Sequence, residues 1–154
     1  MKKNLQLLCA FAFAVITCTA QETTEPVTNK SNRIILHFDD TTGIFTQLGR
    51  ILIDRGYDID WKDREFGIIR TSPGKHYSYA NYHTQIKTIF RDNTVTLYAY
   101  TGYSEINDEV KYTPKKGFIH SIDNKAWVEM MKMAEMLKPQ KITYTRVAQT
   151  RDDL

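Results

Sequence analysis

Cysteine is almost absent from the chain. Its 154 residues include two, Cys9 and Cys18, and both lie among the first twenty residues. If these twenty residues are a leader that is removed, the remaining chain can form no internal disulfide. It also holds no cysteine available as a nucleophile.

Excess charge and catalytic glycine motifs are missing as well. The formal net charge of +3 falls to +1 when Lys2 and Lys3 leave with the leader. Such a chain lacks the concentrated positive charge that favours nucleic acid, so no nucleic-acid partner is expected. The sequence has no G-x-S-x-G elbow and no glycine loop that would cradle a phosphate, so those two catalytic classes are unsupported.

The first twenty residues match a secretory signal peptide. Lys2 and Lys3 precede an apolar run from Leu5 to Ile16, and small residues follow as far as Ala20. The run is too short to span a bilayer, and no stop-transfer pattern follows it. We therefore expect residues 1–20 to be removed and the protein to be exported, to the periplasm or to the outer membrane.

Cys18 supports a second interpretation of the leader. In a lipoprotein, Cys18 would become the lipidated N-terminal residue and the only link to a membrane. Ile16 and Thr17 are larger than is usual before a lipidated cysteine, whereas Cys18 and Ala20 suit an ordinary small-x-small cleavage site. Cleavage after Ala20 is the preferred interpretation, and lipidation of Cys18 is the alternative.

The remaining chain divides into three parts. Residues 21–32 are polar and threonine-rich, which is typical of a flexible tether. Residues 33–148 have the size of one domain and can bury a core without metals or disulfides. Residues 149–154 form a C-terminal tail.

Hydrophobic periodicity predicts a strand at residues 33–38 and a helix that follows it. The group Asp39-Asp40-Thr41-Thr42 is suited to capping that helix, and Gly56 to ending it, with Tyr57 folding back on the last turn. Its apolar stripe comprises Ile44, Phe45, Leu48, Ile51 and Leu52.

Two hairpins are expected next. The first joins Tyr57–Trp61 to Phe66–Thr71 through a charged corner, with Tyr57, Ile59 and Trp61 on one side. The second turns at Asp92-Asn93, two residues that tolerate a type I′ turn. Counting outward places Phe90/Val95, Thr88/Leu97 and Ile86/Ala99 on an apolar side. It places Arg91/Thr94, Ile89/Thr96, Lys87/Tyr98 and Gln85/Tyr100 on the other.

The sequence pattern in the last third of the domain predicts one more helix and two short strands. Asp123 or Asn124 would cap the helix and Pro139 would follow its end. Its apolar stripe comprises Trp127, Met130, Met131, Ala134 and Leu137, which leaves the places of Met133 and Met136 open. We expect residues 109–112 to pair with a sheet edge and residues 142–147 to form an edge strand.

These elements predict a two-layer α+β domain. Its antiparallel sheet would have about five to six strands, with two helices packed on one face in a helix-grip-like arrangement.

Turn glycines, alternating aliphatic residues and a tight hairpin follow one another between Ile34 and Thr101. They comprise Gly56-Tyr57-x-Ile59 after a helix, Gly67-x-Ile69-x-Thr71-x-Pro73, a tyrosine-rich connection and Asp92-Asn93. This pattern resembles small exported α+β domains of bacterial envelope lipoproteins, including those of the lipoprotein subunit of the outer-membrane β-barrel assembly machine. The resemblance implies a non-catalytic binding or scaffolding module, and it supplies no catalytic motif.

Tyrosines gather in the connection before the second hairpin and along it. With Lys87, the side chains of Tyr79, Tyr82, Tyr98 and Tyr100 would form an aromatic and basic surface for a ligand or an envelope partner protein. The alternative is that these tyrosines cover the outer face of the sheet or pack on the loop at residues 102–121.

Histidines carry the remaining chemical hypotheses. His37, Asp39 and Asp40 lack a metal-ligand spacing, so helix capping is favoured there and neither a metal nor a cofactor is expected. A small periplasmic hydrolase or lyase that uses His76 or His83 as its acid or base is the alternative function. A non-catalytic binding or assembly module is the preferred one.

Overall fold

The computed structural model describes residues 22–74, 82–103, 106–110 and 122–145. Within these ranges the chain forms two helices and seven strands. In chain order they are β1 (Arg33–His37), α1 (Ile44–Asp54), β2 (Ile59–Asp63), β3 (Ile68–Thr71), β4 (Tyr82–Arg91), β5 (Thr94–Tyr103), β6 (Ile106–Glu109), α2 (Ile122–Leu137) and β7 (Lys141–Thr145).

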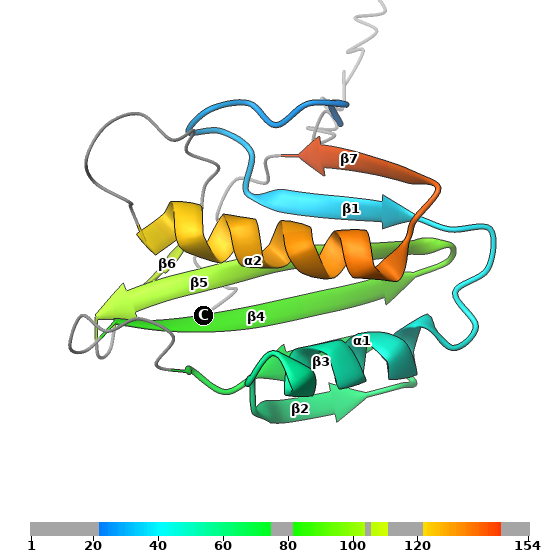
Figure 1. Cartoon of the computed structure of the whole chain (residues 1–154), viewed down its shortest axis with the longest axis horizontal. Coiled ribbons are helices and arrows are strands. Elements are labelled where there is room, and N and C mark those ends of the chain that lie inside the picture. The colour runs from blue at the N-terminus through cyan, green and yellow to red at the C-terminus, as the bar shows by residue number, and fades with distance from the viewer. Residues whose placement is uncertain (1–21, 75–81, 104–105, 111–121, 146–154) are drawn as a thin grey trace, which may run out of the picture.

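The strands form one antiparallel sheet in the order β2-β3-β4-β5-β1-β7 (Figure 1). β5 pairs with β4 along one edge, while its other edge is shared by β1 and β6. Six strands thus make the continuous path, and β6 adds a seventh beside β5. It occupies Ile106–Glu109, slightly earlier than the edge-pairing segment predicted at 109–112, of which residues 111 and 112 lie outside the described ranges.

Both helices lie on the same face of the sheet (Figure 1). The predicted two-layer α+β architecture is therefore confirmed. The core between the layers takes its side chains from α1, α2 and alternate positions of the strands, among them Leu48, Leu52, Trp127, Met130, Ile34, Leu36, Ile86, Val95 and Leu97. Burial of this apolar surface supplies the main stabilising free energy of the domain.

The pairing of β4 with β5 follows the predicted register. Phe90 lies opposite Val95, Thr88 opposite Leu97 and Ile86 opposite Ala99. The turn itself differs from the predicted type I′, because Asp92 has a positive φ of 49° whereas Asn93 does not. A type I′ turn needs a positive φ at both central residues.

A β-bulge distinguishes the first hairpin from its prediction. Ile59 pairs with Thr71, but Trp61 pairs with Arg70, so the register shifts by one residue between Ile59 and Trp61. Because a one-residue shift exchanges the faces of a strand, Trp61 leaves the side of Ile59 and is 49% exposed. The predicted alternation of Tyr57, Ile59 and Trp61 is wrong at its last position.

The ends of α1 are set by two glycines. Gly43, at φ 84°, is the N-cap, and no side chain caps the helix. Asp40 instead accepts a hydrogen bond from the Thr42 amide, and the hydrogen bonds from the side chain and backbone of Thr42 lower the pKa of Asp40. At the other end the amides of Gly56 and Tyr57 donate to Ile53 and Leu52 in the predicted C-terminal motif.

α2 begins one residue before the caps predicted for it. Ile122 is already helical, so Asp123 and Asn124 lie in the first turn. Met133 is fully buried and Met136 is exposed. The buried face of α2 is therefore wider than the predicted stripe, and it includes one of the two methionines whose place the sequence left open.

Residues 22–32 pack along the free edge of β7. The amides of Thr23 and Tyr144 exchange hydrogen bonds with each other's carbonyls at 2.8 Å, and the Asn32 amide donates to Thr145 at 3.2 Å. Ser31 and Asn32 are buried. This part of the predicted flexible tether is thus a clasp, a name we use below for residues 22–32, because its backbone groups satisfy part of the edge.

Gly67 and Gly43 form a matched pair for testing how closely the backbone of Gly67 approaches that of Phe90. Both have positive φ, but a Cβ on Gly67 would lie 2.7 Å from the Phe90 carbonyl oxygen, whereas a Cβ on Gly43 would meet nothing within 4 Å. We expect Gly43→Ala to lower the free energy of unfolding by about 1–2 kcal/mol. Gly67→Ala should cost about 1–3 kcal/mol more. Urea unfolding measures both, and equal losses would contradict the close approach.

The Arg55–Glu129 ion pair joins α1 to α2. Burial raises the pKa of Glu129, but hydrogen bonds from Arg55 and Lys132 lower it by more, so it lies below 4.5 in the folded protein. The stabilisation that the charged Glu129 carboxylate supplies is therefore present above about pH 4.5, and it is lost as the pH falls through the folded pKa of Glu129. Glu129→Gln should lower the free energy of unfolding at pH 7 by about 0.5–1 kcal/mol, and this loss should shrink as the pH falls through the folded pKa of Glu129.

The control for that change is Glu135→Gln, on the exposed side of the same helix. Glu135→Gln should leave the free energy of unfolding unchanged both at pH 7 and in acid. A loss for Glu129→Gln that persists in acid would show that the pair does not act through the carboxylate charge.

Candidate functional site

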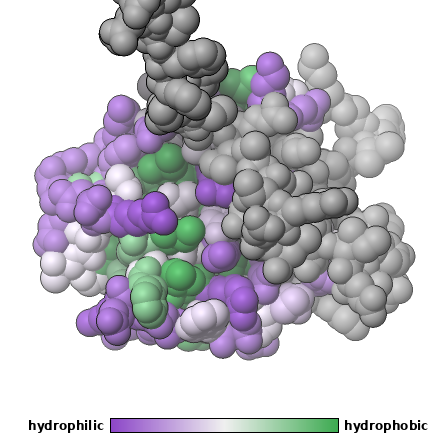
Figure 2. All heavy atoms as spheres, turned by 180° about the vertical axis from the view of Figure 1, so that it is seen from behind, coloured by the Kyte–Doolittle hydropathy of each residue, from purple (hydrophilic) through white to green (hydrophobic). Residues whose placement is uncertain are grey.

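The open face, defined as the face of the sheet opposite α1 and α2, is the candidate site. Strand alternation assigns its residues. In β1, Ile34 and Leu36 are buried toward the helices, while Arg33, Ile35 and His37 are half-buried on the open face. Figure 2 shows this side of the molecule, where apolar residues reach the surface amid hydrophilic ones.

Three isoleucines cross the middle of the open face. Ile68 lies opposite Ile89, Ile89 opposite Thr96, and Thr96 opposite Ile35. We call this row the isoleucine strip. Its isoleucines are half-buried, and with Thr96 between Ile89 and Ile35 they form one row across four strands.

On one side of the isoleucine strip lies a row that alternates aromatic and basic residues. The Arg70 guanidinium lies 5.4 Å from the centre of the Trp61 ring. Lys87 and Arg33 lie 5.6 and 4.8 Å from the centre of the Tyr98 ring. These distances suit cation–π interactions. We call these residues the basic-aromatic row.

On the other side, near the β4–β5 turn, lies a row that we call the hairpin-end row. Arg91 faces Thr94, Thr94 faces His37, and His37 faces Lys141. Arg91 and Lys141 are exposed. The isoleucine strip is therefore bordered by basic side chains on both sides.

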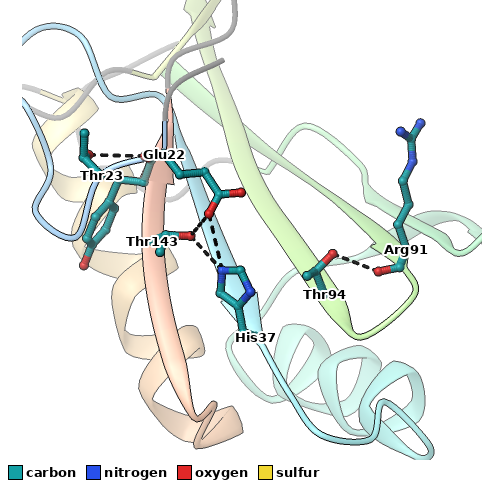
Figure 3. A network of polar contacts seen from close by, with 7 residues as sticks. Glu22, Thr23, His37, Arg91, Thr94 and Thr143 are labelled. Atoms are coloured by element: carbon teal, nitrogen blue, oxygen red, sulfur yellow. Dashed lines mark hydrogen bonds and ion pairs between the residues drawn. The ribbon is translucent and has the colours of Figure 1, made fainter. Parts of the chain in front are cut away.

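His37 connects the hairpin-end row to the clasp. Its Nε2 lies 2.8 Å from the Thr143 hydroxyl and 3.6 Å from the Glu22 carboxylate. The Thr143 hydroxyl donates to the same Glu22 oxygen at 2.9 Å, so one carboxylate meets both groups (Figure 3). Glu22 thereby joins the clasp to β1 and β7.

Two of the basic side chains on the open face are neutralised within the domain. Arg70 pairs with Asp60 at 2.6 Å, and Arg33 lies 3.6 Å from Glu109. Glu109 is buried and also accepts a hydrogen bond from Asn32 at 2.7 Å. These ion pairs fix the positions of Arg33 and Arg70 in the basic-aromatic row. The carboxylates of Glu109 and Asp60 also compensate the positive charge of the two arginines.

The tyrosines predicted as a contact surface have different positions. Tyr98 lies on the open face as predicted, but it is only 2% exposed, and Arg33, Lys87 and the edge-on ring of Tyr100 pack on it. Tyr98 therefore supports the surface rather than forming it. Tyr100 and Lys87 are half-buried on the same face.

Several predicted site residues fall outside the part that the structure describes. Tyr79, His76 and Cys18 lie outside the described ranges, and for Tyr82 only the backbone position at the start of β4 is described. His83 follows it, half-buried and opposite Gly102. The structure thus brings together Lys87, Tyr98 and Tyr100 of the predicted set.

Ile89 and Thr96 of the isoleucine strip lie on the open face as predicted. Ile35 and Ile68 were missed as its other members, although the sequence carries a signal for them. Ile34-Ile35 and Ile68-Ile69 are adjacent pairs, and adjacent residues of a strand face opposite sides. A pair of isoleucines in an alternating strand therefore predicts an apolar residue on the outer face. Arg91 lies opposite Thr94 on this face as predicted. Lys141 was missed, because it reaches the row of Arg91 only through the pairing of β7 with β1.

Among the described residues, no three histidine, cysteine, aspartate or glutamate side chains lie close enough together to hold a metal ion. His37 and Asp39 instead contact Thr143 and Gln140 respectively. Neither described helix is both long and apolar enough to cross a membrane.

No protein-family model matches the chain, and no curated protein matches it either.

The Glu22 contacts predict how firmly the clasp holds the β7 edge. Glu22→Ala removes the carboxylate that meets His37 and Thr143, at a cost of about 1 kcal/mol to clasp closure. Amide hydrogen exchange at Thr23 and Tyr144 should accelerate roughly fivefold. Glu25→Ala, an exposed change in the same segment, should leave these rates unchanged. Equal rates in both variants would contradict the role of Glu22.

Proposed function

We propose that the chain is an exported, non-catalytic binding or assembly module of the bacterial envelope, and that its open face is the surface that contacts a partner. The observation that carries the proposal is the isoleucine strip between two rows that contain basic residues. Apolar surface that is rimmed by polar residues is typical of interaction sites. The basic borders add selectivity for a partner of opposite charge.

The location rests on the sequence. The signal-peptide pattern of residues 1–20 supports export, and the resemblance of residues 34–101 to envelope lipoprotein domains supports a binding or scaffolding role. Cleavage after Ala20 would leave the clasp almost at the new N-terminus. Lipidation at Cys18 would leave only residues 19–21 between the lipid and the docked Glu22, and would hold the clasp edge close to the membrane.

The structure also changes which residues are proposed for contact. Tyr98 is withdrawn as a direct contact because it is buried. Lys87, Ile89 and Trp61, three other residues of the open face, take its place. The alternative hydrolase or lyase based on His76 or His83 gains no supporting observation, so it is not proposed.

Position-specific photo-crosslinking tests the proposal. p-Benzoylphenylalanine at Ile35 or Ile89, on the open face, should give adducts with a defined envelope protein in living cells. The same residue at Ile53 or Met136, exposed apolar positions on the helices, should give about tenfold less, because the helix layer is not the contact surface.

Equal crosslinking from both faces, or adducts only from Ile53 and Met136, would contradict the proposed surface. The N-terminus of the protein recovered from the envelope fraction tests its location. Gln21 as the first residue indicates cleavage after Ala20, and acylated Cys18 indicates the lipoprotein alternative. An intact Met1 in the cytosolic fraction would contradict export.

A further inference from the structure

The isoleucine strip and its borders repeat one pattern along two strands. In β4 the order is Lys87-x-Ile89-x-Arg91, and in β1 it is Arg33-x-Ile35-x-His37. Side chains two residues apart in a strand lie about 6–7 Å apart on the same face, so the two borders are about 13 Å apart. The open face therefore presents a basic, an apolar and a basic position at regular spacing.

The charges on the borders differ in how far they are already neutralised. Arg33 and Arg70 have carboxylate partners in Glu109 and Asp60, and His37 lies beside Glu22. Lys87, Arg91 and Lys141 form no ion pair among the described residues. Lys87 lies on the first border, and the other two lie on the second. Each side of the isoleucine strip therefore keeps at least one positive charge that no carboxylate of the described residues neutralises.

We propose that the partner of the open face is an acidic segment of a protein in extended conformation, with a carboxylate, an apolar side chain and a second carboxylate at every second residue. This inference rests on the function proposed above. An extended segment places such side chains on one face with the same spacing as β4, so its apolar residue meets the isoleucine strip while its carboxylates meet Lys87 and Arg91.

The arrangement fits a peptide better than a lipid. A fatty acid or phospholipid carries its charge at one end of its apolar part, whereas the isoleucine strip has basic side chains on both sides. The isoleucines are also half-buried in a row, which provides contact for a single apolar side chain of a peptide laid along a strand.

Titration with a designed peptide tests the inference. The probe is Gly-Ser-Asp-Ser-Leu-Ser-Asp-Ser-Gly with blocked ends, added to millimolar concentration and followed by the amide NMR shifts of the protein. Shifts should concentrate at Ile35, Lys87, Ile89 and Thr96. A peptide of the same composition with both aspartates on one side of the leucine should bind at least about tenfold more weakly.

Charge reversal on the protein supplies the second arm. Arg91→Glu with Lys141→Glu changes two exposed residues of one border and should weaken binding at least about tenfold. The same protein should bind a probe with lysine in place of its second aspartate, so that affinity is regained. Arg50→Glu with Lys138→Glu makes the same change of charge at exposed positions away from the open face, and should leave binding unchanged.

The outcomes separate this inference from the proposed function. Equal binding of both peptides, or equal loss in both charge-reversed proteins, would reduce the effect to general charge attraction and overturn the inference. Binding to vesicles with phosphatidylglycerol, without shifts from the probe, would overturn it in favour of a lipid surface. The designed peptide could fail to bind while p-benzoylphenylalanine in place of Ile89 still crosslinks to a partner in cells. In that case the proposed function stands, and the inference of an acidic extended partner segment is overturned.

Discussion

The register of the β4–β5 ribbon is the constraint on which the rest of the domain depends. It places Ile86, Val95, Leu97 and Ala99 on one face, where they are buried beneath the helices. A slip of one residue would exchange the faces and bring Lys87 into the apolar layer without a partner for its charge. The same register aligns β1 and β3 with the ribbon, so the isoleucine strip on the open face is a consequence of how the core is formed.

The two outer edges of the sheet are treated differently. The clasp pairs with β7 through Thr23 and is held by the contacts of Glu22 with His37 and Thr143 (Figure 3). β2 instead carries charged residues and a bulge, which are common ways of discouraging edge-to-edge association. With one edge covered and the other charged, the open face with its isoleucine strip is the surface we propose for contact with a partner.

Local patterns were sufficient to predict most of the fold. Strand alternation around Asp92-Asn93 gave the ribbon register, and the stripe from Ile44 to Leu52 gave α1, because both depend on residues near in sequence. The position of Trp61 was missed because a bulge changes the face without a distinctive sequence signal. The burial of Tyr98 was missed because it depends on Arg33, which reaches the ring only through the pairing of β1 with β5. For the candidate site, the face was predictable, but its contact residues depended on non-local pairing.

Cysteine labelling of alternate strand positions tests the two-faced sheet most directly. The chain after residue 20 has no cysteine, so single variants at Ile34, Ile35, Thr88, Ile89, Thr96 and Leu97 report one position each. A thiol reagent applied to the folded protein should modify the variants at Ile35, Ile89 and Thr96 quickly, and those at Ile34, Thr88 and Leu97 only at the rate of unfolding. Similar rates at neighbouring positions, or fast modification at Ile34 and Leu97, would contradict the assignment of the faces and with it the proposed contact surface.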